Sequence, residues 1–187
     1  MSLKTVKLIK EQIKNECLNL GHVKPWFYDK HLLGVEKYAL FLLKKLPKAD
    51  SEIVLLSVWL HDVQRVRGLK GDHQKVGATE AKKILIEYGY KEEIIQTVQN
   101  AILSHACEAV MPDNIEAKIL ATADAMSHYI NDFYLQIAVT GQRNLAEYRA
   151  WALEKLDRDY NKKISFPFAR KEIKSQHEIL IKFFSIK

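Results

Sequence analysis

The stretch that decides the fold runs from Ile53 to Val63 and reads IVLLSVWLHDV. Its uncharged run ends at Leu60, far short of the roughly 18 residues that a membrane span needs, so we predict a buried helix capped by Asp50 or Ser51. The pair His61 and Asp62 follows at once. Neighbouring side chains on a helix diverge by roughly 100°, so this pair can converge on one point only if the helix ends there.

Apolar residues recur at helical spacing on both sides of this stretch, without the alternation that marks strands. Glycine and proline fall between the periodic segments. Besides the stretch above, the predicted helices cover about 2–20, 28–46, 73–88, 91–106, 113–139, 145–160 and 169–184, with a loop at 68–72. The sequence therefore predicts an all-α fold.

Length and composition limit the class of protein. A chain of 187 residues with 48% hydrophobic and 28% charged residues suits one domain with a real core, and excludes disordered and collagen-like classes. The net charge of +6 favours anionic partners, although the basic residues are scattered apart from a group between Arg65 and Lys75. Two cysteines, Cys17 and Cys107, and an amino terminus interrupted by lysines predict a cytoplasmic protein without a secretion signal or membrane contact.

Imidazole and carboxylate side chains, the ligand types that suit divalent ions, form a candidate metal-binding set. Its members are His31, His61, Asp62, His73, His105 and Asp124. The three histidines outside the pair lie on apolar helical stripes, so we predict that they face inward. Any one inward histidine is more often a hydrogen-bonded core residue than a ligand, and that alternative stays open for each of them.

The order His, His-Asp, His, His, Asp resembles the HD-domain superfamily of metal-dependent phosphohydrolases. The resemblance spans about His31 to His128. It rests on the segments His31-Leu-Leu-Gly-Val, Val58-Trp-Leu-His-Asp-Val, Asp72-His-Gln-Lys-Val-Gly-Ala, Ala101-Ile-Leu-Ser-His and Ala121-Thr-Ala-Asp-Ala. It implies a single domain over 1–187, with an HD-like helical bundle at about 28–139 and a helical extension at about 141–187.

The resemblance also implies a metal centre. One divalent ion is expected at His31, His61, Asp62 and Asp124. A second is expected at His73 and His105, with Asp62 bridging the two. About two ions per chain are therefore expected, and Fe, Mn, Zn, Ni, Co and Mg all remain open as their identity.

The expected activity is hydrolysis of a phosphomonoester or phosphodiester in a small, nucleotide-like substrate by metal-activated hydroxide. Asp62 and Arg65 are the predicted catalytic residues. Arg65, Arg67 and Lys75 are the predicted substrate contacts, because cations bind phosphate oxygens. A solvated loop without a substrate role is an equal alternative for Arg67 and Lys75.

Several alternatives stay open. A few proteins with this ligand set use a mixed-valence di-iron pair as an oxygenase, and a non-catalytic nucleic-acid or regulatory module could keep the metal for folding. Nucleic acid is the less favoured partner. His128 can be a structural histidine, orient a ligand or donate a proton. The aromatic residues 26–28 are expected to pack in the core rather than to stack a nucleobase, and those of the tail can close the core or support a homodimer.

Overall fold

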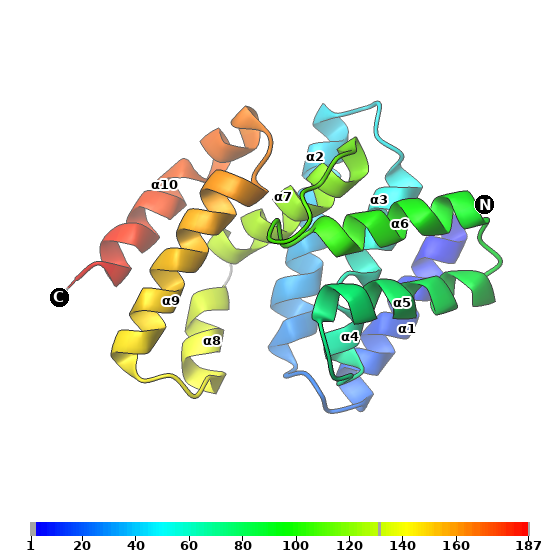
Figure 1. Cartoon of the computed structure of the whole chain (residues 1–187). Coiled ribbons are helices and arrows are strands. Elements are labelled where there is room, and N and C mark those ends of the chain that lie inside the picture. The colour runs from blue at the N-terminus through cyan, green and yellow to red at the C-terminus, as the bar shows by residue number, and fades with distance from the viewer. Residues whose placement is uncertain (1–2, 131, 187) are drawn as a thin grey trace.

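Helix α7 (Ile115–Ile130) runs through the middle of the structure, and nearly all of its described side chains are buried. A computed structural model describes residues 3–130 and 132–186. Figure 1 shows α7 with the amino-terminal helices on one side and the last three helices on the other. These residues form helices and turns without a strand, which confirms the predicted all-α class.

The remaining elements are helices of four to eighteen residues joined by short connections. They are α1 (Leu3–Asn19), the π-helical turn η1 (Phe27–Leu32), α2 (Leu33–Lys45), α3 (Ser51–Leu60), α4 (Val63–Val66), α5 (His73–Glu87), α6 (Glu92–Ser104), α8 (Phe133–Thr140), α9 (Leu145–Arg158), the π-helical turn η2 (Asp159–Lys163) and α10 (Pro167–Phe184). None of these described helices is both long and apolar enough to cross a membrane.

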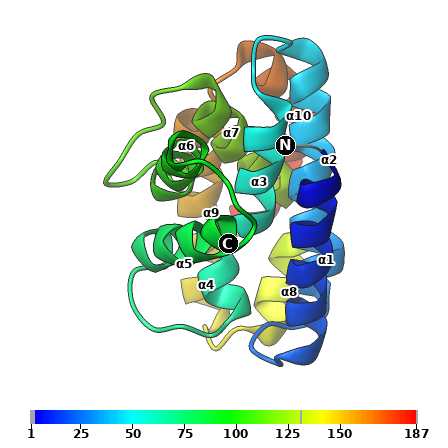
Figure 2. The ribbon, with the colours of Figure 1, turned by 90° about the vertical axis from the view of Figure 1, so that its right-hand side faces the viewer.

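Helix α3 forms where the sequence predicts it. The Asp50 side chain accepts hydrogen bonds from the backbone N–H groups of Glu52 and Ile53 at 2.8 and 3.2 Å, and so satisfies two donors that lack partners within the helix. Every residue from Val54 to Leu60 is buried. Figure 2 shows α3 between α1 on one side and α5 and α6 on the other, so the end of α3 lies inside the protein.

The predicted helix over 113–139 is wrong as a single element. The structure has α7 and α8 instead, with Asp132 at the N-terminal cap position of α8. Asn131, inside the predicted helix, and the predicted start of the first helix at Ser2 lie outside the described residues. The Asp132 side chain makes no capping hydrogen bond with the described residues and instead forms an ion pair with Lys30 at 3.5 Å. The apolar spacing continues through residues 133–137, but such spacing does not show where one helix ends and the next begins.

The segment after α8 returns to the centre of the molecule. Helices α9 and α10 pack against each other, and both η2 and α10 pack against α7. Helix α10 begins at Pro167, slightly before its predicted start, because proline at the first helical position loses no hydrogen bond. The turn η2 thereby lies beside the buried middle of α7.

Candidate metal centre

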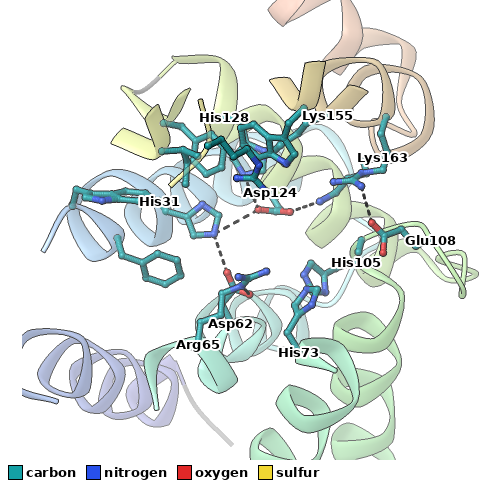
Figure 3. A pocket seen from close by; sticks show the side chains of 18 residues that line it. His31, Asp62, Arg65, His73, His105, Glu108, Asp124, His128, Lys155 and Lys163 are labelled. Carbon is teal, nitrogen blue, oxygen red and sulfur yellow. Dashed lines mark hydrogen bonds and ion pairs between the residues drawn. The ribbon is translucent and has the colours of Figure 1, made fainter. Parts of the chain in front are cut away.

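Four of the predicted ligands meet at one buried point. His31 comes from η1, His61 and Asp62 from the junction of α3 and α4, and Asp124 from the middle of α7. Asp62 has φ −112° and ψ 20°, outside the helical region. Its side chain can therefore approach that of its neighbour, and His61 Nε2 lies 3.6 Å from Asp62 Oδ2. His31 Nε2 lies 3.3 Å from Asp62 Oδ2 and 3.7 Å from Asp124 Oδ1. Figure 3 marks both contacts with dashed lines. All four side chains are less than a tenth exposed.

Each aspartate divides its two oxygens between histidines and a cation. Asp62 Oδ2 faces the histidines, while Oδ1 accepts a hydrogen bond from Arg65 Nε at 3.1 Å. Asp124 Oδ1 faces the histidines, while Oδ2 accepts one from Lys163 Nζ. Burial by itself would raise the pKa of both carboxyl groups, but neighbouring charges, among them Arg65 for Asp62 and Lys163 for Asp124, hold each pKa well below its ordinary value. Both groups are therefore ionised carboxylates.

The histidines present the atom that a metal needs. His61 Nδ1 lies 2.8 Å from the Val58 carbonyl oxygen and His105 Nδ1 lies 2.6 Å from that of Ile102. A carbonyl only accepts, so each Nδ1 carries the hydrogen and each neutral ring has its lone pair on Nε2. Burial lowers the pKa of His61, and lowers that of His105 to about 3. Both rings are thus held in the neutral form that binds metal ions.

The donor set fits a divalent ion. His31 Nε2 and His61 Nε2 are only 3.3 Å apart, and two carboxylate oxygens face them. Lone pairs this close repel each other in a buried site unless a hydrogen or a cation lies among them. His31 Nδ1 is buried and has no hydrogen-bond partner among the described residues. One atom each from His31, His61 and Asp62 lies within 4.8 Å of the others.

A second donor group shares Asp62 with the first. Asp62, His73 and His105 each offer an atom within 4.8 Å of the others. His73 is the first residue of α5 and is partly buried, and its helix is capped by the Asp72 side chain. Burial lowers the pKa of His73, as it does for His105. All six predicted ligands therefore line one site, and the shared carboxylate links its two halves.

Five of the six predicted ligands, all except His61, line a cavity of about 400 Å³. Figure 3 shows these five side chains around it. Tyr28 packs on Trp59 in the core, as predicted. Phe27 is likewise buried in the core, as predicted, and Trp26 is half-buried and packs against the core. Both side chains also line the cavity, as does Trp151 of α9, which sequence periodicity does not show.

The predicted substrate contacts separate into two kinds. Arg65 lines the cavity, and its side chain is half exposed. Arg67 instead forms ion pairs with Glu16 at 2.7 Å and Glu80 at 3.0 Å, between α1 and α5. Lys75 is exposed on the first turn of α5 and is not among the described residues that line the cavity. The structure therefore favours the alternative without a substrate role for Arg67 and Lys75, because charge near the pair at 61–62 does not reveal where a side chain points.

Three functional candidates from the carboxyl-terminal segment were not predicted. Lys155, Asp159 and Lys163 are all buried, and Lys155 and Lys163 line the cavity. Asp124 raises the pKa of Lys163 against the opposing effect of burial. A usable signal did exist: Tyr148, Ala152, Lys155 and Asp159 recur at helical spacing, which places two charged residues on the inward stripe of α9 and η2.

Comparison with protein families matches residues 28–128 to the HD domain. The chain belongs to the HD domain family. The match covers both donor groups of the site and ends at His128, so the extension that supplies Lys155 and Lys163 lies outside it. Searches of curated proteins and of solved structures found no match. An HD domain with buried groups of histidine and aspartate indicates a metal-dependent phosphohydrolase.

Proposed function

We propose that this HD domain protein is a cytoplasmic, metal-dependent phosphohydrolase that cleaves a phosphomonoester or phosphodiester bond in a small, nucleotide-like substrate. The observation that carries the proposal is the pair of donor groups that share Asp62 beside one cavity. Two unpaired cysteines, Cys17 and Cys107, support the location.

The first ion would be held by His31, His61, Asp62 and Asp124. The second would be held by Asp62, His73 and His105. Divalent ions bound there would supply Lewis-acid chemistry, because they neutralise phosphate charge and lower the pKa of water. The protein's own contribution is to keep the imidazoles of His61, His73 and His105 neutral and the two carboxylates ionised, which the burial and pairing described above achieve.

The walls of the cavity suit an anionic substrate with an aromatic part. Five basic side chains line it against three acidic ones. They are Arg65, Arg143, Lys155, Arg158 and Lys163, against Asp62, Glu108 and Asp124. Because Arg65 uses only Nε for Asp62, its two terminal nitrogens would donate to phosphate oxygens. The faces of Trp26 and Trp151 would bind a planar base, and a volume of about 400 Å³ is within the usual range for small-molecule sites.

The test measures metal content and hydrolysis together. Protein purified without a metal-affinity step is analysed for bound metals and then offered a panel of phosphomonoesters and phosphodiesters with added Mn²⁺. The wild type should carry about two ions and cleave a member of the panel. Asp62→Ala should lose most of the metal and all of the hydrolysis, whereas Asp157→Ala, on the exposed side of α9, should behave as wild type.

Two results would count against this proposal. A wild type that is fully loaded with metal but cleaves neither ester class would contradict it. Hydrolysis that persists in metal-free protein or in Asp62→Ala would contradict the assignment of the site. A content of about one ion per chain, with hydrolysis present, would leave the proposed activity standing. It would show that His73 and His105 contact the substrate instead of binding a second ion.

A further inference from the structure

His128 follows the same hydrogen-bonding rule as two histidines of the metal centre. His61 and His105 each direct Nδ1 to a fixed acceptor on the protein and Nε2 toward the donor groups. His128 Nδ1 lies 2.8 Å from Asp159 Oδ2, and its Nε2 lies 3.3 Å from Asp124 Oδ1. His128 thus has the orientation of a ligand, although the family resemblance gave it no defined role.

Asp159 is itself held in place. Its side chain is fully buried at the start of η2, and Oδ2 also accepts a hydrogen bond from Lys155 Nζ at 2.9 Å. An ionised carboxylate can only accept, so the hydrogen of this contact is on His128 Nδ1. With that hydrogen on Nδ1, the nitrogen whose lone pair a bound ion would use is Nε2, the atom that faces Asp124.

The Nε2 atom of His128 lies close to two predicted ligands of the first ion. His31, Asp124 and His128 each offer an atom within 4.8 Å of the others. The rings of His31 and His128 are nearly parallel, at 7° and 5.5 Å between centroids. Two of these three residues already belong to the first ion's predicted ligands, so an ion bound there would lie beside His128 Nε2.

We propose that His128 is a further ligand of the ion held by His31, His61, Asp62 and Asp124, and that Asp159 is its positioning residue. The inference rests on the metal centre of the proposed function. Histidine ligands commonly donate their second ring N–H to a carboxylate or carbonyl, which fixes the tautomer and makes the other nitrogen a stronger donor. Here that carboxylate comes from η2, outside the matched residues 28–128.

The test is a titration of metal-free protein with Co²⁺, followed by calorimetry and by the visible absorption of the bound ion. His128→Gln should weaken Co²⁺ binding at the first site by about 10- to 100-fold and change the absorption spectrum. Asp159→Asn should weaken it in the same direction. The double variant should be no weaker than His128→Gln alone, because both changes remove one interaction. Asp157→Asn, exposed two residues before Asp159, is the matched control.

A measurement on the wild type avoids any dependence on folding of the variants. Nitrogen-15 spectra of the histidine rings, recorded with and without Zn²⁺, should show His128 protonated on Nδ1 in both states and an Nε2 resonance that moves when Zn²⁺ binds. An unmoved Nε2 resonance, or Co²⁺ affinity and absorption unchanged in His128→Gln, would overturn the proposal. A protein that binds Co²⁺ in this way but cleaves no phosphoester would refute the proposed function while supporting the ligand assignment.

Discussion

Asp62 and Asp124 show how single atoms are fixed in this site. Each gives one oxygen to the histidines and the other to a cation, Arg65 or Lys163. A carboxylate group can rotate about its Cβ–Cγ bond, so the contact of one oxygen with the cation fixes the orientation in which the other oxygen faces the donor group. Charge neutralisation and orientation are therefore supplied by the same contact.

Lys163 can be tested by its removal from the metal-free protein. Lys163→Met leaves Asp124 as a buried carboxylate without its ammonium partner, and breaking a buried pair in this way costs about 3–5 kcal/mol of unfolding free energy. Urea denaturation in the presence of a chelator measures the loss. Lys162→Met, next in the chain but exposed, should change stability by less than about 0.5 kcal/mol. Equal losses in the two variants would show that the pair contributes nothing.

Arg65 and Arg67 make a matched comparison for substrate binding. Arg65→Met should lower kcat/KM by about 100-fold, because it removes donors that would bind the phosphate of the proposed substrate. Arg67→Met should leave kcat/KM within about two-fold of the wild-type value, a far smaller change than that of Arg65→Met. The reason is that Arg67 is held by Glu16 and Glu80. Steady-state kinetics at a temperature where both variants are folded decides the matter, and a larger effect from Arg67 would reverse the assignment.

The sequence predicts ligands better than their partners. His31, His61, Asp62 and Asp124 were predictable because their order and the landmarks around them resemble a known family. Lys163 was not, because a basic residue near the end of a helix is usually exposed. Asp159 continues the inward spacing of Tyr148, Ala152 and Lys155, but this spacing does not reveal which side chain it meets. The burial of Lys163 depends on how η2 packs against α7, which is a tertiary contact without a local pattern.

At the scale of elements, Arg67 joins three helices. It follows α4 and forms ion pairs with Glu16 on α1 and Glu80 on α5. Burial would raise the pKa of Glu16, but the hydrogen bonds from Arg67 and Gln12 and the charge of Arg67 together outweigh it and leave this pKa lowered. Lys83 and Arg67 lower the pKa of Glu80. Both carboxylates therefore stabilise the fold only while they are ionised.

The sign of the pH dependence follows from these lowered pKa values. A carboxyl group with a lower pKa in the folded state stabilises the protein above its ordinary pKa of 4.5, and this stability is lost as pH falls through the folded value. The unfolding free energy of metal-free protein should thus fall between about pH 5 and pH 3. In Arg67→Met the fall should be shallower, which urea denaturation across this range would reveal. Parallel curves for the two proteins would contradict the role of Arg67.

Helix positions were predictable where apolar spacing and a stop signal agree. Helix α3 has both, with Asp50 at its start and the pair His61 and Asp62 at its end. The break between α7 and α8 was missed because apolar residues continue in phase across Asn131 and Asp132. Periodicity reports which face is apolar, but it does not report where the chain changes direction.

For the whole molecule, the metal centre connects most of the fold. Its predicted ligands come from η1, from the junction of α3 and α4, from α5, from the residue that follows α6, and from α7. An ion that binds only the folded state stabilises it by about 2.7 kcal/mol when its concentration is 100 times Kd. Metal bound at this point therefore opposes the separation of all of these elements.

Metal removal should lower the melting temperature of the wild type. Adding Mn²⁺ back to chelator-treated protein should restore it, because binding is coupled to folding. Asp62→Ala should show a much smaller rise with Mn²⁺, since Asp62 belongs to both donor groups. Calorimetric scans over a series of Mn²⁺ concentrations measure the effect. Equal rises in the two proteins would mean that Mn²⁺ binds somewhere else.

The place of η2 in chain order affects how the centre is assembled. A ribosome completes the helices through α7 before it adds Asp159 and Lys163, and domains begin to fold as they emerge. At that stage Asp124 and His128 have neither the carboxylate nor the ammonium that later holds them. We expect the nascent chain to take up metal weakly until η2 leaves the exit tunnel and packs against α7.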